Sequence, residues 1–252
     1  MQSTFSTFQI ISNNLSRSLE TTAKSPAVAQ QTKYFKQHIG EVKSAGDLMK
    51  NYRLLSYALK AFGLDDMVNS RALVRKILDG GVSDPKSLAN KMNDTRFKEF
   101  AKAFDFAAHG AQTTSRAAAS TEIIEKFTRQ TLETEAGATN ESVRLALYFT
   151  RKAATITSAF DILADKALLK VVRTTLSMPE AMSQQNIDTQ AKALDKKIKY
   201  ADFQDPAKVK RFVQRFTAMA DMNAPQAVSG GAGLAVGQDL LMSLQGLKLG
   251  GL

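Results

Sequence analysis

Apolar residues recur at spacings of three and four along almost the whole chain, and this spacing constrains the fold more than any other feature. Such spacing places side chains on one face of an α-helix, whereas a half-buried strand needs strict alternation, which is scarce here. All five prolines stand where helices can begin or be separated. Proline is tolerated in the first turn of a helix, because the N–H groups of that turn have no partner within the helix. The sequence therefore predicts an all-α protein, an elongated or globular helical bundle.

One stretch of the chain occurs twice. Residues 44–55 (SAGDLMKNYRLL) and 158–169 (SAFDILADKALL) are identical at five of twelve positions and lie 114 residues apart. In both, a serine followed three residues later by an aspartate fits a capping box at the start of a helix. Other matches keep nearly the same offset: Tyr34-Phe35 with Tyr148-Phe149, and residues 94–104 with 206–216. We infer an ancient duplication of an all-α unit.

Each copy is expected to form one continuous helix, over 45–62 and 159–177. The core face of the first copy is expected at Leu48, Tyr52, Leu55, Leu59 and Phe62. In the second copy Lys166 and Arg173 interrupt the same face, so a different face should turn inward or the two cations should extend to solvent.

Spacing and repeat together divide the chain into five segments. They are an amphipathic N-terminal segment (1–25), a first helical repeat (26–109), a connecting helix (110–139), a second helical repeat (140–221) and a Gly/Leu-rich flexible C-terminal tail (222–252).

Residue types that carry catalysis are scarce. The chain has no cysteine and only two histidines, which excludes disulfides, thiol catalysis and zinc sites of the cysteine type. The adjacent acids Asp65 and Asp66 fit the first turn of a helix better than an acid–base pair. The glycine-rich run at 230–237 lacks the strand and the Gly-Lys-Ser/Thr of a phosphate loop. We therefore expect no catalytic, metal-binding or cofactor-binding residue, no small-molecule substrate and no enzymatic activity.

Both ends of the chain carry an apolar stripe with few charges. Residues 2–16 hold no charge at all, and residues 229–252 hold only two charged side chains. The stripes are candidate protein–protein interfaces at Phe5, Phe8, Ile11 and Leu15, and at Leu240, Leu244 and Leu247. Two readings stay open: the ends dock on the body or fray in solvent, or they order only against a protein partner or a second copy.

The net charge of +10 favours anionic partners. Its densest part, residues 190–216, has eight cations against three carboxylates, but apolar residues at helical spacing lie between them. A solvated helix face is the favoured interpretation, and the alternative is a basic helical protein that binds nucleic acid or a membrane surface. No apolar run approaches 18 residues, so no transmembrane segment is expected.

The run over residues 4–67 resembles the start of an alphaproteobacterial family known as domain of unknown function 1217. The most specific stretches are NLSRSLE at 14–20 and LLSYALKAFGLDDM at 54–67. Members are similar over most of their length and are often encoded among flagellar genes. The resemblance carries no catalytic residue, and it implies a non-enzymatic flagellum-associated protein that acts through helix-mediated protein contacts.

Flagellar export substrates lack cysteine and begin with an uncleaved, uncharged segment rich in Ser, Thr and Asn, as residues 2–16 do. The resemblance thus implies an exported structural component or a cytoplasmic assembly factor, with a slight preference for the first. The partners would be flagellar components or a second copy.

Overall fold

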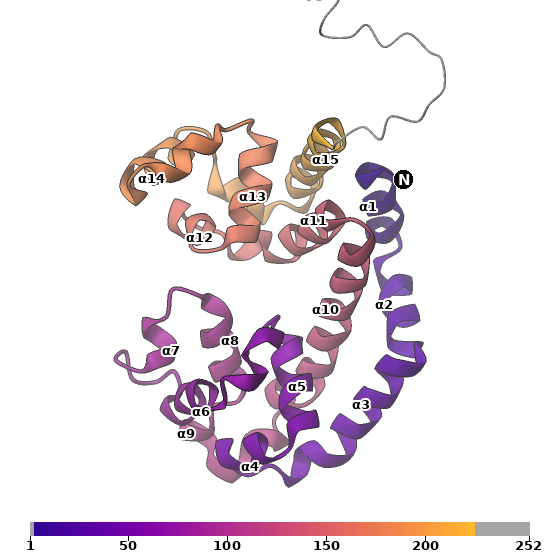
Figure 1. Ribbon diagram of the computed structural model, residues 1–252, viewed down its shortest axis with the longest axis vertical. Coiled ribbons are helices and arrows are strands. Elements are labelled where there is room, and N and C mark those ends of the chain that lie inside the picture. Colours follow the sequence, from indigo (N-terminus) through magenta and orange to yellow (C-terminus); the bar gives the residue numbers. More distant parts are fainter. Residues whose placement is uncertain (1–2, 225–252) are drawn as a thin grey trace, which may run out of the picture. The chain divides into compact units, whose positions relative to one another are not determined.

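The computed structural model describes residues 3–224, and every regular element in that range is a helix (Figure 1). The expected all-α class is confirmed. The α-helices are α1 (Thr4–Asn13), α2 (Leu15–Lys24), α3 (Pro26–His38), α4 (Ala45–Lys50), α5 (Tyr52–Ala61), α6 (Arg71–Gly80), α7 (Leu88–Lys91), α8 (Thr95–Ala103), α9 (Phe106–His109), α10 (Thr121–Thr139), α11 (Glu141–Lys152), α12 (Ala159–Leu163), α13 (Lys166–Thr175), α14 (Ile187–Asp195) and α15 (Pro206–Asn223). Short 3-10 helices lie between them at η1 (Ile39–Glu41), η2 (Asp65–Asn69), η3 (Gly110–Ser115), η4 (Ala117–Ala119), η5 (Ala153–Thr155), η6 (Glu180–Gln184) and η7 (Tyr200–Gln204).

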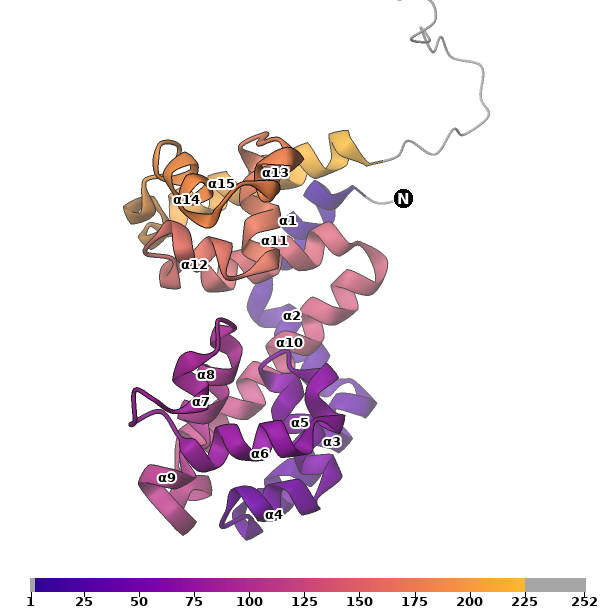
Figure 2. The same cartoon turned by 60° about the vertical axis from the view of Figure 1, so that its left-hand side comes forward.

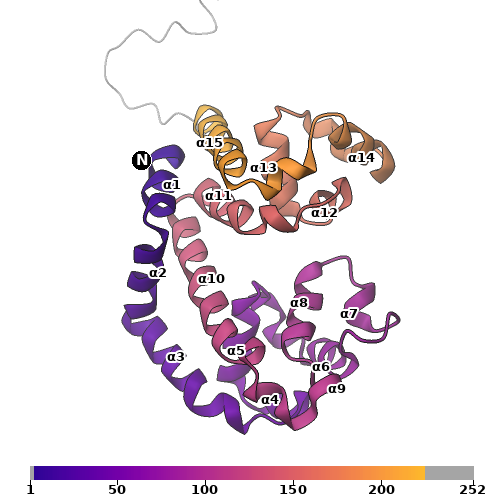
Figure 3. The same cartoon turned by 180° about the vertical axis from the view of Figure 1, so that it is seen from behind.

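The buried apolar side chains form two clusters. The first core takes residues from α3 to α10, and Phe35 and Phe104 are fully buried in it. The second core takes residues from α11 to α15, together with Phe8 from α1. Helix α10 serves both, because Phe127 is buried in the first core and Ala136 packs against the second. It packs along α2 and α5 and then against α11 (Figure 3).

Each repeated stretch forms two helices, so the prediction of one continuous helix at 45–62 and at 159–177 was wrong. The backbone is extended at Asn51 and at Asp165. The Asn51 side-chain oxygen accepts from the N–H of Leu54 at 3.1 Å, and Asp165 accepts from the N–H of Leu168 at 3.1 Å. Each side chain therefore caps a new helix, which a capping residue can do without a glycine or proline.

The new helix start shifts the face that is buried. The sequence places Tyr52 in the core, but it is 52% exposed, because it opens α5 instead of continuing α4. Tyr57 is buried instead and stacks between Phe35 and Phe127. Its burial raises the pKa of the Tyr57 hydroxyl to about 12, although a hydrogen bond with Thr32 opposes the shift. In the second copy a different face does turn inward, with its buried side chains at Leu168, Val171 and Val172.

The two segments share local structure in detail. Tyr34 bonds to the cap residue Asn51, and Tyr148 donates to the cap residue Asp165 at 2.5 Å. Helices α5 and α13 are equal in length, and their positions differ by the offset of the sequence repeat. The same is true of η1 and η5. The capping box predicted at both copies is complete only at Ser158. Descent of both segments from one ancestral unit stays a prediction.

The turns after α5 and α13 differ in one residue that matters. Gly63 and Ser177 both adopt a positive φ, +68° and +50°. This lets the N–H of the next residue, Leu64 or Met178, reach back to the carbonyl of Leu59 or Arg173. A left-handed backbone costs a residue with a Cβ about 1–2 kcal/mol. The second copy therefore carries strain that glycine removes in the first.

Replacing Ser177 with Gly should raise the free energy of unfolding by about 0.5–1 kcal/mol, because relief of the strain exceeds the added chain entropy. The matched change Gly63→Ala should lower it by about 1–2 kcal/mol, since the new Cβ would also lie 3.2 Å from the Gln130 amide. Urea denaturation of both variants measures the two signs, and equal signs would contradict this account.

Candidate interaction surfaces

The first helix of the chain is short and is followed by a break. The Ser3 hydroxyl caps α1 by accepting from the N–H of Ser6 at 3.1 Å. Asn14 then leaves the helical backbone conformation, with φ −123° and ψ 36°, and α2 begins at Leu15. The apolar stripe predicted along residues 2–16 therefore does not follow a single helix axis.

The stripe residues have different environments. Phe8 is 2% exposed in the second core, and Ile11 packs against that core. Leu15 is half-buried at the start of α2, whereas Phe5 is 39% exposed. The chain thus uses Phe8 and Ile11 for its own packing and leaves Phe5 accessible. The other three candidates, Leu240, Leu244 and Leu247, lie outside the described residues, as does the predicted tail from residue 225 onward.

Polar groups from the second repeat hold α1 at both of its ends. The Asp221 carboxylate accepts from the N–H of Thr4 at 2.7 Å and from that of Phe5 at 3.0 Å. At the other end, Lys210 Nζ donates to the side chain of Asn13 at 3.3 Å. Helix α1 therefore lies antiparallel to α15 and packs on α11 (Figure 2). Asn140, the cap of α11, adds a bond to the Thr4 hydroxyl at 3.0 Å.

Asp221 carries the charge in this contact. Partial burial works against its ionisation, but hydrogen bonds from Thr4 and Phe5 outweigh that effect and hold the pKa of Asp221 below its ordinary value. A carboxylate at a helix N-terminus also meets the positive end of the helix dipole. No sequence pattern marks Asp221, because its partners lie 217 residues away.

A buried ionic cluster joins α10 to α11. The Glu133 side chain is 2% exposed, and its carboxylate accepts from Arg129 Nε at 2.9 Å and from Arg151 at 2.8 Å on both oxygens. Arg151 also donates to the Gln130 side chain at 3.2 Å and lies over the ring of Tyr148. Two guanidinium groups thus compensate one buried carboxylate, which would be costly alone.

The same region carries a link between helices of the two cores. Lys152 of α11, whose side chain is 10% exposed, donates to Glu99 of α8.

Burial raises the pKa of the Tyr148 hydroxyl, and the neighbouring charge of Asp165 raises it further. Tyr148 therefore stays protonated and acts as a fixed donor.

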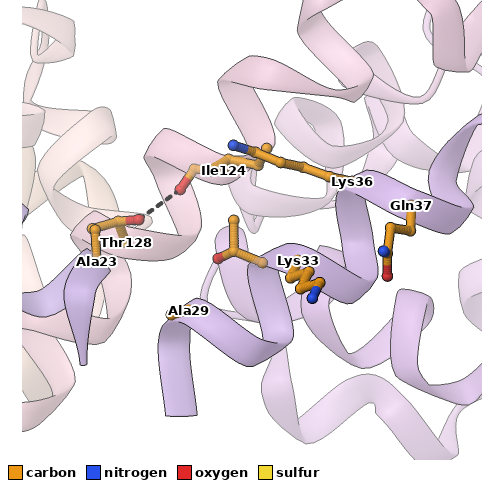
Figure 4. Close-up of a pocket in the computed structure, with 8 residues that line it drawn as sticks. Ala23, Ala29, Lys33, Lys36, Gln37, Ile124 and Thr128 are labelled. Atoms are coloured by element: carbon orange, nitrogen blue, oxygen red, sulfur yellow. Dashed lines mark hydrogen bonds between the residues drawn. The ribbon is translucent and has the colours of Figure 1, made fainter. Parts of the chain in front are cut away.

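Two shallow grooves mark the surface. One, of about 580 Å³, runs between α3 and α10 (Figure 4). Its lining residues are Ala23, Ala29, Thr32, Lys33, Lys36, Gln37, Ile124 and Thr128. The other, of about 630 Å³, is more open and lies between α6 and α7.

The basic stretch at 190–216 covers α14, η7 and α15. Its eight cations are all exposed: Lys192, Lys196, Lys197, Lys199, Lys208, Lys210, Arg211 and Arg215. Its aromatic rings lie in the second core, where Phe203, Phe212 and Phe149 pack against one another. Proteins that bind single-stranded nucleic acid use exposed aromatic rings on which the bases stack. The rings of this stretch pack against the core instead.

The acids Asp65 and Asp66 lie in the first turn of η2, as expected. His38 lies 3.1 Å from Glu41, and His109 ends α9. Within residues 3–224, no three metal-ligating side chains lie together. None of the helices there is both long and apolar enough to cross a membrane.

Replacing Glu133 with Gln should lower the free energy of unfolding by about 3 kcal/mol, because it leaves two guanidinium groups without their carboxylate. Glu135→Gln is the matched control, because Glu135 is exposed on the same helix. Its effect should stay within about 0.5 kcal/mol. Denaturant midpoints of the two variants give the comparison, and similar values would refute the structural role of the cluster.

Replacing Asp221 with Ala should free α1 from α15, because two N–H groups lose their acceptor, at a cost of about 0.5–2 kcal/mol. Amide hydrogen exchange should accelerate in residues 4–11 and not in α10. In the wild type the protection of α1, measured relative to the intrinsic exchange rate at each pH, should fall as pH drops below 3.8, the ordinary pKa of Asp, through the lowered value in the folded state. Asp79→Ala, in an exposed pair with Arg75, is the control. Unchanged exchange in α1 of the Asp221 variant would count against the contact.

Comparison with known proteins places the chain in a family. The sequence profile described as Protein of unknown function (DUF1217) matches residues 61–209, more than half of the chain. The stretch at 54–67 reaches into this range, whereas 14–20 precedes it. The crystal structure of Protein AGR_C_984 from Agrobacterium tumefaciens is similar, with 46% identity and a TM-score of 0.82 over 88% of this chain and 94% of that one. No protein with a curated description matches. The chain belongs to the family described as Protein of unknown function (DUF1217).

Proposed function

We propose that the chain is a non-enzymatic, flagellum-associated protein that acts through helix-mediated contacts with protein partners. The observation that carries the interaction part is that several large apolar side chains remain exposed on the folded chain. The exposed apolar residues are Phe5, Ile10, Tyr52, Phe160, Ile187 and Met222. Exposed apolar side chains mark a contact site where they lie together, and two of these residues, Phe5 and Ile10, are on the same helix, α1.

Two partly buried carboxylates have structural roles, and this also supports a non-enzymatic function. Asp161 completes the capping box of α12, and hydrogen bonds from Thr157 and Ser158 outweigh its partial burial and lower its pKa. Asp94 is partly buried, which opposes its ionisation, but its pairing with Arg96 outweighs burial and lowers its pKa as well.

The flagellar part of the proposal rests on the resemblance of residues 4–67 to a family whose members are often encoded among flagellar genes. Of the two roles that this implies, we favour an exported or structural component over a cytoplasmic assembly factor. Helix α1 supports this choice, because it is uncharged and leaves Phe5 and Ile10 on the surface.

If the chain is exported, it should appear in the culture supernatant of a wild-type strain and be absent from the supernatant of a strain blocked in flagellar export. A cytoplasmic marker protein controls for lysis. Detection of the chain only in the cytoplasm of both strains would refute export.

A pair of variants sharpens the same experiment. Ile10→Lys places a charge on α1 at a side chain that is 64% exposed, so folding should be retained. Thr21→Lys adds the same charge at an exposed position of α2. We expect the first variant to lower the exported fraction and the second to leave it unchanged. Equal export of both variants would show that the uncharged start of the chain is not recognised.

A further inference from the structure

We propose that the groove between α3 and α10 binds an acidic amphipathic helix of a partner protein. This inference rests on the proposed function, because it specifies the surface and the partner chemistry of a helix-mediated contact. It draws on the shape of the groove, the small apolar side chains that line it and the charge of its rim (Figure 4).

The groove is built by one continuous face of α3. Its lining residues on that helix fall at 29, 32, 33, 36 and 37, the spacing of a single helical stripe. Helix α10 adds Ile124 and Thr128, one turn apart, and α2 adds Ala23. A helical partner would therefore meet three nearby helices along one seam, which is the arrangement of helix-in-groove recognition.

The groove has a local cause in the sequence. Helix α2 packs on α10, whereas α3 packs on α5. Between α2 and α3 the backbone becomes extended at Ser25, and Pro26 opens the new helix. The chain thus changes its packing partner at this point, and the groove lies beside this change, between α3 and α10.

The apolar part of the lining is made of small side chains at the exposed Ala23 and Ala29, with the half-buried Ile124 beside them. The two hydroxyl groups that line it already have partners in the chain. Thr32 Oγ1 lies 3.0 Å from the Tyr57 hydroxyl, and Thr128 Oγ1 donates to the Ile124 carbonyl at 2.9 Å. The groove therefore offers a partner apolar contact without hydroxyl groups that need to be satisfied.

The rim of the groove is positive. Lys33 and Lys36 are exposed on adjacent turns of α3, and neither is within ion-pair distance of a carboxylate among residues 3–224. The lining residues include no Asp or Glu, and residues 21–40 contain none. Two unpaired cations three residues apart match carboxylates spaced by three or four residues on a partner helix. Gln37 adds an amide beside them.

The test uses a fluorescent synthetic helix of Ala, Leu and Glu, with its Glu residues spaced by three and four, and a matched peptide with Gln in place of Glu. Fluorescence anisotropy measures the binding of both peptides to the full chain. We expect only the Glu peptide to bind, and its affinity to fall as salt is added, because the rim charges are exposed.

Lys33→Glu/Lys36→Glu should weaken binding about tenfold, because attraction at the rim becomes repulsion. Ala29→Trp should weaken it as well, by occupying the groove while the charge is kept. The control Lys196→Glu/Lys197→Glu makes the same charge change at exposed positions after α14 and should alter affinity less than about twofold.

Three results would overturn the proposal: unchanged affinity in the groove variants, equal loss in the control variant, or equal binding of the Gln peptide. A fourth would be concentration-dependent dimerisation that Ala29→Trp abolishes, since it would make a second copy the occupant. The peptide assay is independent of export. An exported chain that fails to bind the Glu peptide refutes the groove alone, and a chain that binds the peptide without export or flagellar association refutes the proposed function alone.

Discussion

The buried carboxylate of Glu133 is the charge on which the packing of α10 against α11 depends. Arg129 of its own helix and Arg151 of α11 both donate to it, so neither helix can move away without leaving a buried charge unpaired. Helix α10 carries Phe127 into the first core, and α11 opens the second. One ionic cluster therefore joins the two helices around which both cores are arranged.

Sequence reasoning recovers what is local. The helical class, the helix starts after Ser44 and Ser158 and the exposed basic face at 190–216 follow from spacing and from cap residues, which act over three or four positions. The break at Asn51 was missed because asparagine is tolerated inside helices, and only the bond from Leu54 shows that it caps. That miss placed Tyr52 in the core instead of Tyr57.

Distant contacts are not visible in such patterns. Glu133 looks like an ordinary helical glutamate until Arg151 approaches from the next helix. Helical spacing predicts the apolar stripe that includes the interface candidates Phe8 and Ile11, but the second core that takes them up lies more than a hundred residues away in the chain. Which of the stripe residues remain accessible depends on that docking and not on the stripe itself.

The contact between Asp221 and α1 has a consequence for the order in which the chain can fold during synthesis. Thr4 leaves the ribosome early, whereas Asp221 is added 217 residues later, about 10–40 s at ordinary elongation rates. The core that receives Phe8 is likewise encoded after residue 140. Helix α1 can thus be placed only after the second core and Asp221 have been made, and until then each new chain presents this uncharged helix undocked.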